Sequence, residues 1–485
     1  MRMSKGALFT RGLLKNAIFQ QPASSRAAMA LPRFLGRALR LLPVVLLLMP
    51  GMAGALIQTM SLQARVDAAE ENAVILLEAG TYAGPIVIDK PLTLDGRGVA
   101  TIDAGGKGSV VSIETDGAIL KGLHLTNSGD SHNDIDAGVQ VRGDFNVLKD
   151  LIIDNCLFGI DLGQASNNII KRNHIASKPF SLGLRGDAIR LWYSFNNKVT
   201  DNVIRDSRDT VVWYSADNLI ARNDARRGRY SLHFMYSKHN DVIDNHYENN
   251  AVGIFLMYSD GVVIRNNLIA NANGPTGMGI GFKESSDVEI AHNQLLYNAI
   301  GIYLDLSPFQ PDTTNRIHDN IIAFSGIGIS FLSDWPGNLI QHNDFRGNIT
   351  QVAVSGNGKS VDRNTWDGNY WDDYEGFDLN HDGIGDHAYE LYSYADRIWM
   401  DVPPARFFKG TPMLETLDFL ERLAPFSKPS RLLSDARPLI EASFTEKLLT
   451  RRHSEDDADA ASNDNTADRS AESDAYRKLR QSLGR

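Results

Sequence analysis

The chain has 485 residues, a formal net charge of −10 and a pI near 5.7, which exclude a nucleic-acid-binding surface because phosphate contacts need clustered Lys and Arg. Its one cysteine, Cys156, excludes an intrachain disulfide, so packing and hydrogen bonding must stabilise the fold. This length ordinarily predicts several compact domains, but that expectation fails for a chain that grows by repetition.

Residues 1–64 predict an export signal with a long basic n-region. Residues 1–40 carry eight basic residues and no acidic one, and residues 41–64 carry no charge. The small residues Ala53-Gly54-Ala55 supply a cleavage site, and an uncleaved membrane anchor is the alternative. We therefore expect the mature protein outside the cytoplasm.

From residue 166 onward the chain repeats the pattern Asn-x-Ile-x-x-Asn-x-Ile, followed by a small residue and an alternating apolar strand. Intervals of 21 to 29 residues separate the second asparagines of successive units, which are Asn173, Asn202, Asn223, Asn245, Asn266, Asn293, Asn320, Asn343 and Asn364. Such intervals fit one coil of a β-solenoid, and stacked asparagines can hold its turns. The sequence predicts an all-β, right-handed parallel β-helix over residues 65–402, with its N-terminal cap within 65–75.

The strand that ends each unit has two faces. We assign one parity to the core, namely Leu191 and Tyr193, Val212 and Tyr214, Phe234 and Tyr236, Leu256 and Tyr258, and Leu304 and Leu306. The opposite parity then faces outward in two columns, one with Trp192, Trp213, Met235 and Met257 and the other with Arg190, Val211, His233 and Phe255. A solenoid normally shows polar groups there, so this apolar patch indicates a binding surface.

The patch contains the donors of a copper site. Thioether sulfur and imidazole nitrogen suit soft Cu(I), and adjacent coils lie about 4.8 Å apart. His233, Met235 and Met257 are therefore predicted to form a shallow site that hands copper on rather than retaining it.

Two alternative roles for the patch involve no metal. Exposed aromatic residues are typical of a protein-docking surface, to which Trp192, Trp213 and Phe255 would contribute. The two tryptophans can equally stack on sugar rings, which keeps a carbohydrate-binding protein open as an alternative. Sugar cleavage would need two carboxylates, and the best cluster is Asp130, His132, Asp134 and Asp136, with which we expect no Arg or Lys. We expect no catalytic residues.

The segment from Asp378 to Asp386 resembles the first part of a calcium loop. Its oxygen ligands would be Asp378, Asn380, Asp382 and Asp386, with Gly383 at the sharp turn. The twelfth position, normally a bidentate acid, is Tyr389. The alternative is a turn-rich cap whose Asp and Asn side chains bond to the backbone.

The block Asn369-Tyr370-Trp371-Asp372-Asp373-Tyr374, followed by residues 382–386, is similar to the closing signature of the NosD family. The coils also resemble repeats of carbohydrate-binding proteins and sugar hydrolases. The NosD resemblance implies a periplasmic accessory protein in copper-site maturation of nitrous oxide reductase, with copper as a transient ligand. Its implied partners are a copper chaperone, nitrous oxide reductase, and the membrane and ATPase subunits of an ABC transporter. The implied contact with the membrane is through the transporter. The alternative is a carbohydrate-binding or polysaccharide-modifying β-helix.

The C-terminal region departs from the repeat. Helical spacing of apolar residues predicts a short helical docking segment within residues 403–450, with Met413, Leu417 and Leu420 on one face. That face either folds back as a cap or, as the NosD resemblance favours, docks on the transporter. Residues 451–485 have no apolar period and predict a disordered acidic tail.

Overall fold

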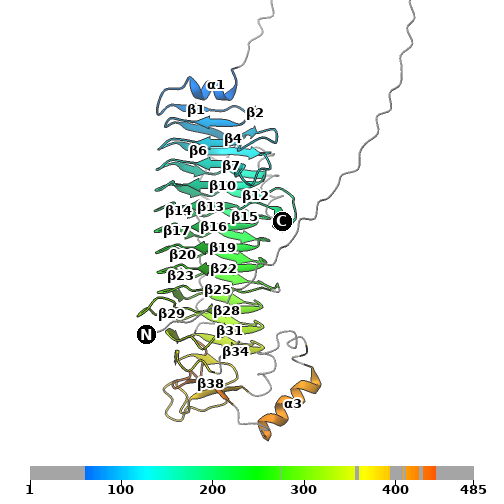
Figure 1. Ribbon diagram of the computed structural model, residues 1–485, viewed down its shortest axis with the longest axis vertical. Helices are drawn as coiled ribbons and strands as arrows, with labels where there is room; N and C mark the ends of the chain where they lie inside the picture. Colours follow the sequence, from blue (N-terminus) through cyan, green and yellow to red (C-terminus); the bar gives the residue numbers. More distant parts are fainter. Residues whose placement is uncertain are drawn as a thin grey trace, which may run out of the picture. The chain divides into compact units, whose positions relative to one another are not determined.

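The computed structural model describes residues 60–274, 276–355, 360–393, 408, 411–424 and 430–443. Within them the chain winds into a stack of short parallel strands, which Figure 1 shows from β1 near one end to β34 near the other. Most coils contribute one strand to each of three ladders. The predicted parallel β-helix is confirmed.

One ladder is a 12-stranded sheet, and it carries the candidate site. Its strands are β3 (Ile86–Ile88), β5 (Val111–Ile113), β7 (Ala137–Val141), β10 (Phe158–Gly163), β13 (Ile189–Trp192), β16 (Asp209–Trp213), β19 (Tyr230–Met235), β22 (Val252–Met257), β25 (Ile280–Lys283), β28 (Ile300–Asp305), β31 (Ile327–Phe331) and β34 (Thr350–Val354).

The other two ladders share β4 (Thr93–Asp103) and β6 (Ile119–Thr126), so they join in a 24-stranded sheet. The first also contains β1 (Val74–Leu76), β8 (Val147–Lys149), β11 (Ile169–Lys171), β14 (Lys198–Thr200), β17 (Leu219–Ala221), β20 (Asp241–Ile243), β23 (Val263–Arg265), β26 (Glu289–Ala291), β29 (Asn315–His318), β32 (Asn338–Gln341) and β35 (Thr365–Asp367). The second also contains β2 (Gly80–Ala83), β9 (Ile152–Cys156), β12 (His174–Ser177), β15 (Val203–Arg205), β18 (Asp224–Arg226), β21 (His246–Glu248), β24 (Leu268–Ala270), β27 (Gln294–Leu296), β30 (Ile321–Ala323), β33 (Asp344–Arg346) and β36 (Tyr370–Trp371).

A buried asparagine ladder joins successive coils at one turn. Asn202 Oδ1, for example, accepts hydrogen bonds from the backbone N and the Nδ2 of Asn173, both at 3.0 Å. The members are Asn173, Asn202, Asn223, Asn245, Asn267, Asn293, Asn320, Asn343 and Asn369. Each rung satisfies backbone and side-chain groups that would otherwise be buried without a partner.

The predicted asparagine column is wrong at two positions. Asn266 is exposed and has a φ of 55°, because it occupies the left-handed turn position just before the ladder residue Asn267. Asn364 belongs to a second ladder, in which its Oδ1 accepts from Asn338 Nδ2 at 2.9 Å. Two asparagine ladders with the same spacing are not separable by periodicity alone.

The N-terminal end of the solenoid is closed by helix α1 (Leu62–Asp67). Ser61 caps this helix, accepting a hydrogen bond from the backbone N of Ala64, and Leu62 and Val66 are buried in the same cluster as the first coils. The cap therefore begins at Leu62, slightly before the predicted range 65–75. It protects strand edges that would otherwise template further pairing.

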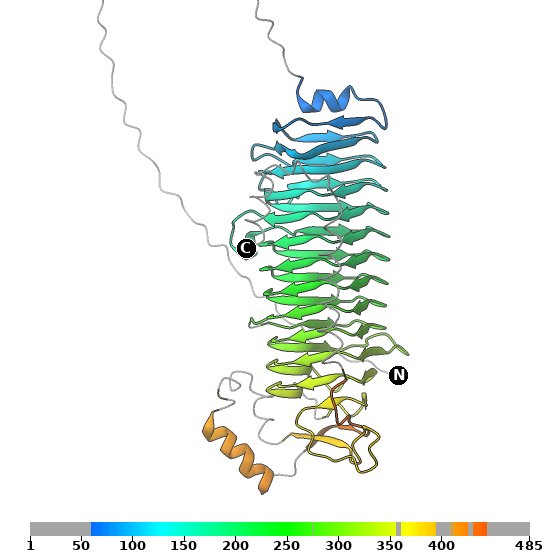
Figure 2. The same cartoon turned by 180° about the vertical axis from the view of Figure 1, so that it is seen from behind.

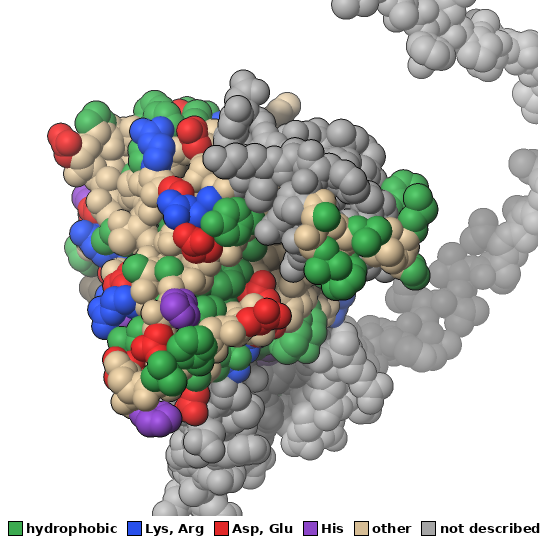
Figure 3. Space-filling model, turned by 90° about the horizontal axis from the view of Figure 1, so that it is seen from below, with side chains coloured by type: hydrophobic (Ala, Val, Ile, Leu, Met, Phe, Trp, Pro, Cys, Tyr) green, Lys and Arg blue, Asp and Glu red, His purple; other side chains and the backbone are tan. Residues whose placement is uncertain are grey.

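The C-terminal end is closed by a returning segment. Strand β38 (Ser430–Asp435) pairs antiparallel with β37 (Tyr389–Ser393). Strand β38 lies beyond the last coils, as its label in Figure 1 and its orange colour in Figure 2 show. Asp435 continues the asparagine ladder, because its Oδ2 accepts from the backbone N and the Nδ2 of Asn369 at 3.0 and 2.9 Å. Seen from this end, hydrophobic and acidic side chains are interspersed (Figure 3).

The predicted helical segment 403–450 is helical only in part. Helix α3 spans Pro412–Leu423, whereas residues 430–435 form the cap strand β38. The predicted signal peptide, up to residue 59, and the predicted tail 451–485 lie outside the described residues. No helix in the described ranges has both the length and the apolar character needed to cross a membrane.

Candidate functional site

The outward side chains of the 12-stranded sheet lie in two columns, and strand pairing confirms the predicted register. The first, here called the Trp-Met column, contains in order Trp192, Trp213, Met235, Met257, Lys283 and Asp305. The second, here called the His column, contains Asp161, Arg190, Val211, His233, Phe255, Gly281 and Tyr303.

The inward positions confirm half of the core assignment and correct the other half. The buried side chains are those predicted before each turn: Leu191, Val212, Phe234, Leu256 and Leu304. The assignment is wrong two residues later, where the side chains are exposed or half-buried: Tyr193, Tyr214, Tyr236, Tyr258 and Leu306. Each of these has a φ between 45° and 51°. Strict alternation holds only in extended backbone, so the left-handed turn sends these side chains outward.

The four tyrosines form a stacked ladder on the surface, here called the tyrosine ladder. Ring centroids of neighbours lie 4.9, 5.2 and 4.8 Å apart from Tyr193 through Tyr214 and Tyr236 to Tyr258. Stacked rings cover each other's faces and leave edges and hydroxyls to solvent. A sugar needs an open ring face to stack on, so the tyrosine ladder favours a protein partner over a glycan.

The tryptophans beside this ladder are partly covered by a cation. The Arg190 guanidinium lies 5.8 Å from the ring centroid of Trp192 and 5.9 Å from that of Trp213. Arg190 also pairs with Asp161 at 2.8 Å, and Arg142 pairs with the same carboxylate at 2.7 Å. Asp161 is fully buried, so the two arginines balance its charge and fix this end of the face.

His233 is the least satisfied polar group of the face. It is 8% exposed, and neither ring nitrogen has a hydrogen-bond partner among the described residues. Tyr230 stacks on the imidazole at 4.8 Å between centroids, while Phe255 and Trp213 lie edge-on at 6.0 and 6.2 Å. Burial lowers the pKa of His233, which favours the neutral ring that can donate a lone pair to a metal.

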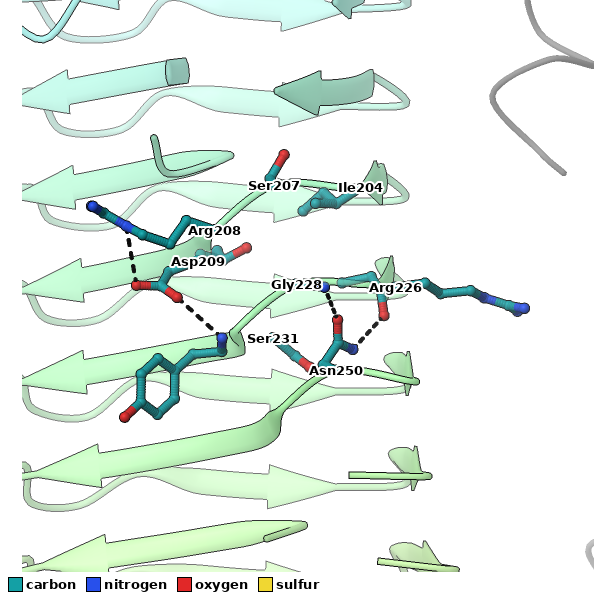
Figure 4. Close-up of a pocket in the computed structure, with 11 residues that line it drawn as sticks. Ile204, Ser207, Arg208, Asp209, Arg226, Gly228, Ser231 and Asn250 are labelled. Atoms are coloured by element: carbon teal, nitrogen blue, oxygen red, sulfur yellow. Dashed lines mark hydrogen bonds and ion pairs between the residues drawn. The ribbon is translucent and has the colours of Figure 1, made fainter. Parts of the chain in front are cut away.

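An irregularity in the sheet places this histidine. The pairing of β16 with β19 shifts between Asp209–Tyr230 and Val211–His233, so β19 carries one extra residue there. Bulges of this kind re-aim side chains and often lie beside functional sites. Asp209, which is labelled in Figure 4, secures the bulge by accepting a hydrogen bond from the backbone N of Tyr230 at 3.1 Å. Arg229 pairs with Asp209 and lies 5.0 Å from the Tyr230 ring centroid.

The donor set of this face fits a soft monovalent cation better than a hard one. No three His, Cys, Asp or Glu side chains within the described ranges converge as a metal-binding group. The half-buried thioethers Met235 and Met257 lie on paired positions, and His233 supplies the unpartnered imidazole. Thioether and imidazole donors are those that Cu(I) accepts. The rings over His233 mean that a metal reaches it only if one of them moves.

The calcium-like loop is held by its own backbone. Asp378 accepts hydrogen bonds from the backbone N of His381, at 2.6 Å, and of Gly383, at 2.9 Å, while Asp386 accepts from that of Leu379 at 2.8 Å. The Asn380 and Asp382 side chains likewise accept backbone N–H groups. Tyr389, at the twelfth position, stacks on Trp371 at 4.4 Å inside the cap. These contacts are those of the turn-rich cap, and calcium binding stays a prediction.

The acidic loop 130–136 has a basic neighbour that is distant in the sequence. Lys178, two coils onward, pairs with Asp130 and donates to the backbone O of Ser128 at 2.6 Å. Asp136 is buried and accepts from the backbone N of Ser131 at 2.8 Å. These carboxylates brace two loops.

Two of the three predicted docking residues of α3 have exposed side chains in the structure. Met413 is 80% exposed and Leu420 is also exposed, whereas the Leu417 side chain lies outside what the structure describes. Met278, whose sulfur lies on the same face as His233, was not predicted as a site residue. It stands in an irregular loop between β24 and β25, outside any repeated strand, so column alignment had no means of finding it.

This geometry defines a class of protein: a parallel β-helix that presents one aromatic, thioether-bearing face on an otherwise regular stack. Residues 179–376 match the family model NosD, described as periplasmic copper-binding protein (NosD). The predicted resemblance to NosD is confirmed.

Two curated relatives, each named probable ABC transporter binding protein NosD, extend the match. The Pseudomonas aeruginosa protein is 28% identical over 397 residues, which is 75% of this chain and 87% of the relative. The Stutzerimonas stutzeri protein is 28% identical over 421 residues, which is 78% of this chain and 88% of the relative. The A-module of the Azotobacter vinelandii mannuronan C-5 epimerase AlgE6 is also similar, at 14% identity with a TM-score of 0.48, covering 62% of this chain and 93% of the module.

Proposed function

We propose that this protein is a periplasmic, non-enzymatic accessory protein that acts with an ABC transporter in copper delivery to nitrous oxide reductase. The observation that carries the proposal is His233, a buried imidazole whose two nitrogens lack partners among the described residues, beside the thioethers of Met235 and Met257. An unpaired buried polar group costs stability, so its presence in a repetitive fold calls for a ligand. The NosD relationship supports copper as that ligand.

The chemistry suits transient holding. Neutral imidazole and thioethers bind Cu(I) without a thiolate, and such a site binds more weakly than a cysteine cage. Because the pKa of His233 is lowered, protons compete little with the metal for the ring nitrogen. In this proposal a copper chaperone loads the face, and the face passes the ion on to nitrous oxide reductase.

Partner binding uses the same face. The tyrosine ladder, Trp192, Trp213 and Phe255 supply aromatic contact area beside the donors, so docking brings the acceptor to the metal. Helix α3, with exposed Met413 and Leu420, is proposed to contact the transporter's membrane subunits, which would keep the solenoid near the membrane.

The test is anaerobic titration of the mature protein with Cu(I) against a chromophoric competitor. The variant combines His233→Ala with Met235→Ala, and the control is His239→Ala, which removes an exposed histidine of a nearby turn. Saturable binding that is lost in the double variant and kept in the control supports the proposal. Absence of binding in the wild type contradicts it and brings oligosaccharide screening forward.

A further inference from the structure

A third methionine reaches the face from outside the repeat. Met278 lies in the loop between β24 and β25, and its half-buried side chain rests over Gly281. A Cβ added at Gly281 would lie 2.4 Å from Met278 Sδ and 2.5 Å from Phe255 Cδ2. The sulfur therefore occupies space that any larger residue at position 281 would take.

Strand pairing places Gly281, over which this sulfur lies, relative to the other donors. Gly281 follows Phe255 in the His column, and Phe255 follows His233. Met257, in the neighbouring column, stands two residues from Phe255 on the same face. Met278 Sδ and the Phe255 ring thus lie together over Gly281, and the His233 imidazole contacts the Phe255 ring from the preceding coil.

We propose that Met278 is a further thioether ligand for Cu(I), and that the donors form a row in which Met278 receives the ion on the exposed side of Phe255. This inference rests on the proposed function. A row fits the burial, since Met278 is partly exposed whereas His233 is covered by aromatic rings. In this proposal, copper passes from Met278 to His233 when the Phe255 ring moves.

The competing role for Met278 is purely structural, because thioethers pack well against aromatic rings. Leucine separates the two roles, since it fills a similar volume without sulfur. The test variants are Met278→Leu and Gly281→Ala, whose new methyl group would displace both the sulfur and the Phe255 ring. The control is Met413→Leu, which removes the thioether of an exposed methionine on α3.

Cu(I) affinity is measured by anaerobic competition, and the number of sulfur neighbours of the bound copper by X-ray absorption. We expect Met278→Leu to weaken binding by about tenfold, as loss of a supporting group does at other metal sites, and to remove one sulfur neighbour. Gly281→Ala should weaken binding in the same direction, and Met413→Leu should change neither readout.

The outcomes separate this inference from the proposed function. If the wild type binds copper and Met278→Leu keeps the same affinity and sulfur count, Met278 only packs on Phe255 and the inference is wrong while copper binding stands. If the wild type does not bind Cu(I), both are wrong. Near-ultraviolet circular dichroism checks that each variant keeps its aromatic packing.

Discussion

The asparagine ladder and the His column run along the same coils, yet they treat polar groups in opposite ways. In the asparagine ladder every rung accepts and donates; Asn223, for example, receives two hydrogen bonds from Asn202 and donates to Asn245 and to the backbone O of Val199. In the His column the His233 imidazole has no hydrogen-bond partner within the described ranges. The comparison indicates that the asparagine ladder stabilises the solenoid, whereas the His233 imidazole is retained at a cost in stability.

The largest effect should come from breaking a rung of the asparagine ladder. Asn223→Ala removes the hydrogen bonds of the Asn223 side chain with Asn202, Asn245 and the backbone O of Val199, and we expect a loss of about 3 kcal/mol in the free energy of unfolding. Urea denaturation measures the loss, and hydrogen exchange should show it centred on the neighbouring coils, because solenoid stability is local. The control, Asn266→Gly at the exposed left-handed position, should change stability by less than about 0.5 kcal/mol. Equal losses would contradict the assigned rungs.

The end of the ladder should be the next most sensitive point. Asp435→Ala removes the acceptor for Asn369 and for Trp371 Nε1, which donates at 3.2 Å, and we expect a loss of about 2 kcal/mol. The last coil would then loosen and expose strand edges, so light scattering should detect association. Asp435→Asn tests whether both carboxylate oxygens are needed as acceptors. The amide group of Asn would direct an N–H donor toward protein groups that are themselves donors. Wild-type behaviour of both variants would refute the capping role.

In the His column we expect a substitution to increase the free energy of unfolding rather than to lower it. His233→Phe replaces an unpartnered imidazole with a ring that suits the surrounding Tyr230 and Phe255, and should stabilise the protein by about 1 kcal/mol while abolishing copper binding. Urea denaturation and Cu(I) competition are measured on the same preparations. Destabilisation by His233→Phe would mean that the imidazole has a structural partner and would remove the contrast between the two columns.

The pH dependence sharpens the same contrast. The pKa of His233 is lowered by burial, so the unfolded chain takes up a proton at about pH 6.5 that the folded protein resists. Stability of the wild type should therefore fall relative to His233→Phe as pH falls through that region. Asp187, whose pKa burial raises to about 6, acts in the opposite direction but is present in both proteins and cancels. Thermal unfolding at pH 7.5 and 5.5 gives the difference, and identical shifts would contradict it.

The sequence predicts much of this fold because its coils repeat. Asparagine spacing and period-two strands were sufficient to place Trp192, Trp213, Met235 and Met257 in one column. The predictions failed where the backbone leaves the extended conformation, since the left-handed φ of Tyr214 reverses its side chain. Contacts between distant segments, such as Lys178 with Asp130, depend on how loops meet in space and have no periodic signature.

The smallest effect on stability, but a specific effect on docking, is expected at the tyrosine ladder. Tyr236 stacks on both Tyr214 and Tyr258, so Tyr236→Ser should cost about 0.5 kcal/mol. The matched control is Tyr297→Ser, which removes a ring stacked on Phe324 at 5.1 Å but lies outside the tyrosine ladder. If the ladder is the docking surface, only Tyr236→Ser should weaken binding to copper-free nitrous oxide reductase, as measured by calorimetry. Equal affinity of both variants would place the docking surface elsewhere and leave the exposed tyrosines as a packing feature of the coils.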